Sequence, residues 1–133
     1  HGPGQLVGYP IVDLRNLGGD LHTFIRAIES ALVTTCQDFG VDATIRDGLT
    51  GVWVENRKLA SIGVGVKKWI SMHGYAINIT PESLTGFNHI TPCGLQGVSM
   101  TTVCDEAAKA ITVQEFAQAT TKHLEQEFSK LAQ

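Results

Sequence analysis

The sequence has 133 residues, of which 43% are hydrophobic and 17% are charged, and its formal charge is −3. A chain of this length folds as one domain that buries roughly 65–70% of its unfolded surface. No apolar run approaches the ~20 residues of a membrane-spanning helix. The sequence therefore argues against a membrane protein. Because no basic run is longer than Lys67-Lys68, it also argues against a nucleic-acid-binding protein.

The three cysteines, Cys36, Cys93 and Cys104, are an odd number without a C-x-x-C spacing, and no secretion signal opens the chain. We therefore expect free thiols, a reducing compartment and a cytoplasmic location. The chain begins with His1 rather than Met. We expect residues 1–133 to form a single domain that is the C-terminal portion of a longer protein.

The first forty residues predict an edge strand and a helix. Glycines and prolines surround one short apolar stretch within residues 1–19, which is typical of a loop and an edge strand. After Asp20, a suitable N-cap, apolar residues recur at three- and four-residue steps until Gly40. Cys36 lies on this apolar stripe, so we expect it to pack in the core.

From residue 41 to residue 79 the apolar period changes to two, which predicts an antiparallel sheet. The expected strands are residues 41–45, 51–55, 58–66 and 75–79, with a hairpin turn at Asn56-Arg57. A second helix should cover residues 112–131, because Thr112 and Glu115 form a capping box before an apolar stripe. The sequence therefore predicts an α+β fold, a mainly antiparallel sheet with packed helices.

Residues 80–101 are predicted to be irregular, and a loop of this length in a compact domain is typical of a functional site. Within it, Cys93 lies in I-T-P-C-G-L, between a proline and a glycine. A structural cysteine usually lies on the apolar face of a helix or strand. A reactive cysteine instead needs a nearby positive charge, oriented N–H dipoles or a base. The candidates for that role are Lys58, His73 and His89.

Each of these residues also has a simpler interpretation. Lys58 alone is typical of an exposed hairpin lysine, and together with Arg57, Lys67 and Lys68 it forms either a solvated edge or a surface for an acidic partner. His73 alone is typical of a structural histidine. A metal site of His73, His89 and Cys93 is not expected, because a loop does not fix their spacing. Cys104 is expected to be packing.

Other catalytic patterns are absent from the sequence. There is no G-x-S-x-G motif for a serine hydrolase. The G-x-G of Gly63-Val64-Gly65 lies within a predicted strand and lacks the following helix that a phosphate-binding loop requires.

Four motifs in series resemble one enzyme family over residues 1 to about 100. They are H-G-P-G-Q-L-V-G-Y-P-I-V-D-L at the start, G-V-W-V with K-L-A-S-I-G in the middle, then H-G-Y-A-I-N-I, and finally P-C-G-L. In this order the sequence is similar to the lipoate-biosynthesis octanoyltransferases. The resemblance implies the fold shared with biotin and lipoate protein ligases.

The resemblance also implies a reaction, without metal, nucleotide or other cofactor. An octanoyl group passes from acyl carrier protein to a lysine of a lipoyl domain, in 2-oxoacid dehydrogenase subunits or the glycine cleavage H protein. Cys93 would carry the acyl group as a thioester, with Lys58 as its catalytic partner. The implied acyl-binding residues are His1, Ser61, Ile62, Gly63, His73, Gly74, Tyr75 and Ala76.

The sequence departs from this family at its start. The family carries an Arg-Gly-Gly stretch and a strand-rich segment before H-G-P-G, whereas this sequence begins at His1. We therefore expect part of the acyl pocket wall to be missing. Two alternatives remain open: an ATP-dependent lipoate or biotin ligase, which would give Cys93 no role, and a non-catalytic domain that holds an acyl carrier or a lipoyl domain.

Overall fold

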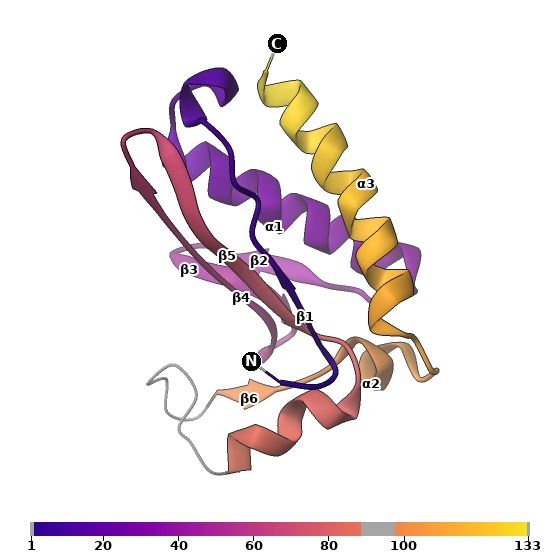
Figure 1. The fold of residues 1–133 in the computed structure, drawn as a ribbon. Coiled ribbons are helices and arrows are strands. Elements are labelled where there is room, and N and C mark those ends of the chain that lie inside the picture. Colours follow the sequence, from indigo (N-terminus) through magenta and orange to yellow (C-terminus); the bar gives the residue numbers. More distant parts are fainter. Residues whose placement is uncertain (1, 89–97, 133) are drawn as a thin grey trace.

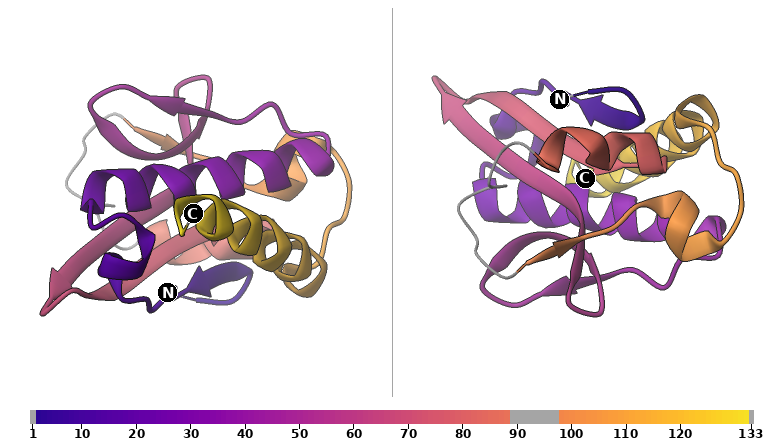
Figure 2. Two further views of the ribbon diagram at one scale, coloured as in Figure 1. Left: turned by 90° about the horizontal axis from the view of Figure 1, so that it is seen from above. Right: turned by 90° about the horizontal axis from the view of Figure 1, so that it is seen from below.

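The computed structural model describes residues 2–88 and 98–132 of the chain. Its centre is a mainly antiparallel sheet, and the helices α1 and α3 pack together against it (Figure 1). Viewed along the vertical axis of Figure 1, α1 and α3 lie side by side (Figure 2). The predicted α+β class is confirmed.

The elements follow one another in a simple order. The strands are β1 Gln5–Gly8, β2 Thr44–Arg46, β3 Leu49–Val54, β4 Arg57–Lys67, β5 Ile70–Asn78 and β6 Ser99–Met100. The helices are α1 Leu21–Asp38, α2 Val103–Ala107 and α3 Val113–Leu131, with the 3-10 helices η1 Leu14–Leu17 and η2 Pro81–Asn88. The sheet order is β1-β5-β4-β3-β2, and β6 pairs with β4. None of these described helices combines the length and the apolar character needed to span a membrane.

Helix α1 begins and ends where its sequence predicts. The carboxylate of Asp20 accepts hydrogen bonds from the first backbone N–H groups, and Gly40 follows the helix with a φ of +81°. Cys36 is fully buried in the core, as expected, and this burial raises the pKa of its thiol to about 12.

Helix α3 is fixed by its cap and by aromatic packing. Its predicted capping box is present, with reciprocal hydrogen bonds between Thr112 and Glu115. The ring of Phe128 stacks on Phe24 of α1, with ring centroids 5.3 Å apart. The core therefore lies between these two helices and the sheet, where Phe116 is fully buried.

Several predicted strand boundaries are wrong, each for a local reason. The strand expected at residues 41–45 is only Thr44–Arg46, because the N–H of Val41 bonds to the carbonyl of Cys36 at the end of α1. Strand β5 begins at Ile70 rather than at residue 75. The alternation expected of a strand is broken at His73, which has a left-handed φ of +65° within β5. The hairpin between β3 and β4 turns at residues 55–56, one position earlier than predicted, since Val54 pairs with Arg57.

The segment predicted to be irregular contains two short elements, η2 and β6. Strand β6 pairs in parallel with β4, opposite Arg57 and Lys58. The β4–β5 ladder begins only at Ala60, so β6 occupies the edge of β4 that β5 leaves free. This pairing brings the chain that follows residue 97 alongside Lys58.

Candidate active site

Lys58 is the second residue of β4, and its side chain is only 6% exposed. Its Nζ lies 5.7 Å from the ring centroid of Trp53, its partner on β3. A lysine amine above an indole ring gains a favourable electrostatic interaction. The expectation of an exposed hairpin lysine in a basic surface cluster is therefore wrong, because the hairpin turns this side chain onto a buried tryptophan.

Gly51 supplies the space that Lys58 and Trp53 occupy. A Cβ on Gly51 would lie 2.7 Å from the carbonyl oxygen of Ala60 and 3.4 Å from Cε of Lys58, and its φ is +139°. The position therefore excludes every side chain. The indole N–H of Trp53 is buried without an acceptor in the described part of the chain.

A carboxylate from α1 holds this glycine in place. Glu29 is 1% exposed, and its Oε2 accepts a hydrogen bond of 2.9 Å from the backbone N–H of Gly51. Its other oxygen accepts a hydrogen bond of 2.9 Å from Arg26. Because a buried carboxylate needs such partners, the contact fixes β3 to the helix where β3 passes Lys58.

An ion pair joins β4 to the segment after β6. Arg57 donates two hydrogen bonds of 2.9 Å to the carboxylate of Glu106 on α2. The hydroxyl of Thr101 also donates to Glu106, at 2.5 Å. The hydrogen bonds from Arg57 lower the pKa of Glu106 below its usual range, and the hydrogen bond from Thr101 acts in the same direction.

Thr101 is bonded from three directions. Its backbone N–H donates to the carbonyl of Lys58 at 2.9 Å. Its own carbonyl accepts from the side-chain amide of Asn78 at 3.2 Å, and Asn78 accepts from Gln5 at 3.0 Å. The backbone beside Lys58 is therefore held by β1, β4, β5 and α2 together.

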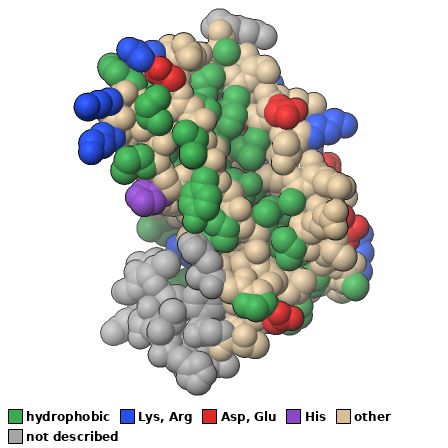
Figure 3. Space-filling view, in the orientation of Figure 1, with side chains coloured by type: hydrophobic (Ala, Val, Ile, Leu, Met, Phe, Trp, Pro, Cys, Tyr) green, Lys and Arg blue, Asp and Glu red, His purple; other side chains and the backbone are tan. Residues whose placement is uncertain are grey.

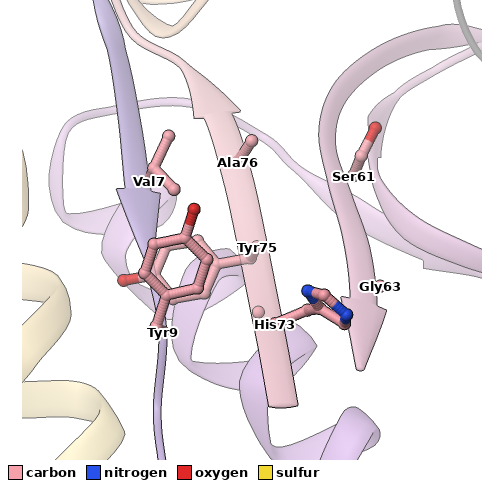
Figure 4. Close-up of a pocket in the computed structure, with 8 residues that line it drawn as sticks. Val7, Tyr9, Ser61, Gly63, His73, Tyr75 and Ala76 are labelled. Carbon is pink, nitrogen blue, oxygen red and sulfur yellow. The ribbon is translucent and has the colours of Figure 1, made fainter. Parts of the chain in front are cut away.

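A pocket of about 220 Å³ opens on β1, β4 and β5 (Figure 4). The pocket is smaller than the roughly 300–1,000 Å³ typical of drug-sized ligands, and so suits a narrow one. Its lining residues are Val7, Tyr9, Ser61, Gly63, His73, Gly74, Tyr75 and Ala76.

The glycines decide the shape of this pocket. A Cβ on Gly63 would meet no atom of residues 2–88 and 98–132 within 4 Å, so its missing side chain leaves space open beside these residues. A Cβ on Gly74 would overlap the carbonyl oxygen of Gly8, and one on Gly8 would overlap the ring of Tyr75. Gly63 therefore opens the pocket, while Gly8 and Gly74 allow β1 to close against β5.

The structure brings together six of the residues that the resemblance implied: Ser61, Gly63, His73, Gly74, Tyr75 and Ala76. Burial raises the pKa of the Tyr75 phenol, whose ring also packs against the core. Ile62 does not line the pocket, and its side chain packs against the core. His1, His89 and Cys93 lie outside the described residues.

The remaining candidates are structural. Cys104 packs against the core as expected, and its sulfur exchanges hydrogen bonds of 3.3 Å with the backbone of Ile111. Within residues 2–88 and 98–132, no group of three or more His, Cys, Asp or Glu side chains is arranged to hold a metal ion.

Sequence reasoning missed four residues of the site: Val7, Tyr9, Gly51 and Trp53. Trp53 and Gly51 belong to the G-V-W-V motif, which is part of the family resemblance. The motif did not predict what either residue contacts. Val7 and Tyr9 follow a period of two, but only the pairing of β1 with β5 places them at the pocket.

Comparison with known proteins places these features in a family. The model of the lipoyl protein ligase A/B catalytic domain matches residues 1–125. The chain is 52% identical over 115 residues to an octanoyltransferase of Geobacter sulfurreducens. The aligned residues are 86% of this chain and 48% of that protein. The chain spans about half the length of the curated relatives it matches.

Solved structures with low sequence identity share the fold. Biotin protein ligase from Aquifex aeolicus has a TM-score of 0.77 at 12% identity, over 97% of this chain and 54% of that one. A protein of T. acidophilum, solved with bound lipoic acid, has a TM-score of 0.56 at 14% identity, over 96% of this chain and 57% of that one.

The Arg57–Glu106 pair predicts a pH-dependent contribution to stability. Because the pKa of Glu106 is lowered in the folded state, its contribution is present above the unfolded pKa of about 4.3 and is lost as the pH falls further. Glu106→Gln should therefore lower the Tm at pH 7, and the difference from wild type should shrink as the pH falls below about 4. Thermal unfolding from about pH 2.5 to pH 7 measures this difference. Glu125→Gln, at an exposed position of α3, is the control, and a difference independent of pH contradicts the prediction.

Proposed function

The chain belongs to the family of lipoyl protein ligase A/B catalytic domains, and we propose that its parent protein is an acyltransferase. In this proposal an octanoyl group moves from acyl carrier protein to a lysine of a lipoyl domain. The observation that carries the proposal is the pocket on β4 and β5, in the same sheet as the buried Lys58. Relatives named octanoyltransferase, at 40–52% identity, support the chemistry.

In the first half-reaction, the Cys93 thiolate attacks the carbonyl of the donor thioester. A new thioester forms on Cys93, the bond between the acyl carbon and the carrier sulfur breaks, and in this proposal the departing carrier thiolate takes a proton from the Lys58 ammonium, which leaves Lys58 neutral for the second half-reaction. One thioester replaces another, so the step needs no nucleotide to activate the acyl group. It needs a stabilised thiolate, which a nearby ammonium favours, and we assign that role to Lys58.

In the second half-reaction, the lysine amine of the acceptor attacks the thioester on Cys93. An amide forms, the Cys93 thiolate leaves, and the attacking nitrogen loses a proton. We assign the acceptance of this proton to Lys58, directly or through water. The acceptors in this proposal are the lipoyl domains of 2-oxoacid dehydrogenases and the glycine cleavage H protein.

The pairing of β6 and the sequence separation from Cys93 to β6 support the pairing of Lys58 with Cys93. Strand β6 places Met100 opposite Lys58, and Cys93 precedes Ser99 by only six positions in the sequence. A chain spans at most about 3.5 Å per residue, so covalent geometry keeps Cys93 within roughly 20 Å of this pairing.

The acyl chain is assigned to the pocket. Its volume of about 220 Å³ and its lining by glycines, Val7 and Ala76 fit a narrow apolar chain. An ATP-dependent ligase would share the fold, as the structural likeness shows, but it would release pyrophosphate from ATP and free lipoate. Release of pyrophosphate by the parent protein would overturn the proposal.

The covalent intermediate is the most direct test. The full-length parent, mixed with octanoyl-carrier protein alone, should gain the mass of one octanoyl group in intact-protein mass spectrometry. Cys93→Ser should abolish the gain, because it removes the attacking thiolate. Cys36→Ser and Cys104→Ser should retain it, since one thiol is buried and the other packs against Ile111. A gain that survives in Cys93→Ser would sink the assignment.

The role of Lys58 predicts the reactivity of the thiol. Lys58→Met keeps the length of this buried side chain but removes its charge, so it should slow alkylation of Cys93 at pH 7 by about tenfold, as for a thiol pKa about one unit higher. The rate is read by mass spectrometry with iodoacetamide. The matched control is Lys122→Met at an exposed position of α3, which should alkylate at the parental rate. Equal rates in all three proteins would remove Lys58 from the mechanism.

The pocket is tested by filling it. Gly63→Val adds an isopropyl group where the new Cβ would meet no atom of the described residues within 4 Å, so it should leave the Tm within a few degrees while octanoyl transfer falls at least about tenfold. Gly65→Val is the matched control, because a Cβ there also meets nothing within 4 Å, and Gly65 does not line the pocket. Transfer from the shorter butanoyl donor should fall less than octanoyl transfer. The same loss of activity in both glycine variants would place the acyl chain elsewhere.

A further inference from the structure

The β4–β5 hairpin ends in large apolar side chains that the described fold leaves exposed. Trp69 is 47% exposed, Ile70 is 40% exposed and Met72 is 39% exposed. Ile11, on the segment that follows β1, is 69% exposed. We call the following residues the hairpin patch: Ile11, Lys67, Lys68, Trp69, Ile70 and Met72.

The pairing of the strands places Ile11, Lys67, Ile70 and Met72 of this patch on the same face of the sheet as the pocket, and Lys68 and Trp69 form the turn at its end. Gly63 pairs with Gly74, Gly65 with Met72, and Lys67 with Ile70. Cross-strand partners and alternate residues share a face, so Met72 and Ile70 continue the face that begins at Gly74. The bridge between residues 13 and 70 continues the β1–β5 register and sets residue 11 opposite residue 72.

The charges of the hairpin patch are positive. Lys67 and Lys68 are exposed, and neither forms an ion pair within residues 2–88 and 98–132. Of the two acids nearby, Asp13 is bound to Arg15 at 2.7 Å, and Asp20 caps α1. This end of the molecule is therefore basic, although the chain has a formal charge of −3. In Figure 3 basic side chains line one edge of the face, next to apolar ones.

The turn at the end of the hairpin is built at a conformational cost. Lys68 has a φ of +52° and Trp69 a φ of +72°, where two-residue hairpin turns normally carry Asn and Gly. A bulky residue in this conformation is unusual and indicates a functional constraint. The turn holds the indole outward, with Gly19 beneath it: a Cβ on Gly19 would lie 3.6 Å from the Trp69 ring.

We propose that the hairpin patch docks an acidic surface of the carrier protein that delivers the acyl group. An apolar centre around Trp69 with two free lysines complements a partner that has acidic residues around an apolar contact. This inference rests on the proposed function, because it assigns the patch to the donor of that reaction.

The position of the patch favours the donor over the acceptor. Gly65, the partner of Met72, lies seven residues along β4 from Lys58, which is roughly 23 Å at 3.3 Å per residue. The amine of the acceptor is carried on a short four-carbon stem, so the acceptor backbone must come close to Lys58. A carrier protein presents its thioester on a flexible prosthetic group, which allows its folded surface to dock farther away.

The test uses the full-length parent and the charge reversal Lys67→Glu with Lys68→Glu. The KM for octanoyl-carrier protein should rise by at least about tenfold, because a steering attraction becomes a repulsion. The kcat with octanoyl-pantetheine, which carries the thioester without the protein, should stay within about twofold. The KM for the acceptor domain should also stay unchanged. Trp69→Ala, which removes the apolar centre, should raise the carrier KM without changing its dependence on salt.

The matched control carries the same change of charge elsewhere, as Lys109→Glu with Lys122→Glu, both at exposed positions outside the patch. Calorimetric titration with a carrier that bears octanoyl through a non-transferable amide measures docking without turnover. A parent that binds this carrier but transfers nothing would disprove the proposed function and leave the docking intact. The docking proposal is overturned if the control variant raises the KM for octanoyl-carrier protein as much as the charge reversal in the patch does. It is also overturned if the charge reversal lowers the kcat with octanoyl-pantetheine, or if it changes the KM for the acceptor instead of the KM for the carrier.

Discussion

The position of β6 beside Lys58 depends on one backbone contact, in which the N–H of Thr101 donates to the carbonyl of Lys58. It joins residues 43 positions apart through the single parallel pairing that the described sheet contains, β6 on β4. Two residues of pairing would not hold a strand alone. The contact persists because Glu106 binds Arg57 and Thr101, and because Asn78 binds the carbonyl of Thr101. Side chains thus fix a register that the ladder is too short to fix.

The burial of Lys58 shows why so many groups meet at this point. Removing an ammonium from water costs several kcal/mol, whereas a cation above an indole ring recovers about 0.5–2 kcal/mol. Trp53 alone therefore does not offset the burial of a charged Lys58. A chain selected for stability alone would replace such a lysine with an apolar residue. Its presence here, beside a Gly51 that has no side chain and is held by Glu29, is typical of a functional amine.

Local patterns in the sequence predicted the parts of the fold that local physics determines. The two long helices followed from their caps and stripes, because Asp20 and Thr112 satisfy backbone N–H groups only a few residues away. The sheet class followed from the period of two. Residues of the pocket were predicted from the family resemblance of the motifs, and not from the periodicity or composition of the sequence.

The missed features all depend on contacts between distant segments. Strand β6 has two residues, too few for a periodic signal, and exists through its partner on β4. The alternative interpretation of Lys58 as an exposed hairpin lysine assumed that a residue beside a turn is exposed, and only the tertiary position of Trp53 contradicts it. Tyr9 reaches the pocket through the register of β1 on β5. The period of a strand predicts which face of the sheet a residue occupies. It does not predict the register, and so it does not predict which residues of the neighbouring strand lie beside it.

The two faces of β4 are built from different residue types, and the difference points to function. The side chains of Ile62 and Val64 pack against the core, while Gly63 and Gly65 between them leave open space. A glycine within a strand destabilises it by roughly 0.5–1 kcal/mol relative to alanine, and here no neighbouring atom requires the absence of a Cβ. Packing within the described chain therefore does not explain these two glycines. Gly63 lines the pocket, so the acyl chain of the proposed function accounts for its missing side chain, whereas Gly65 lies outside the pocket, opposite Met72 of the hairpin patch.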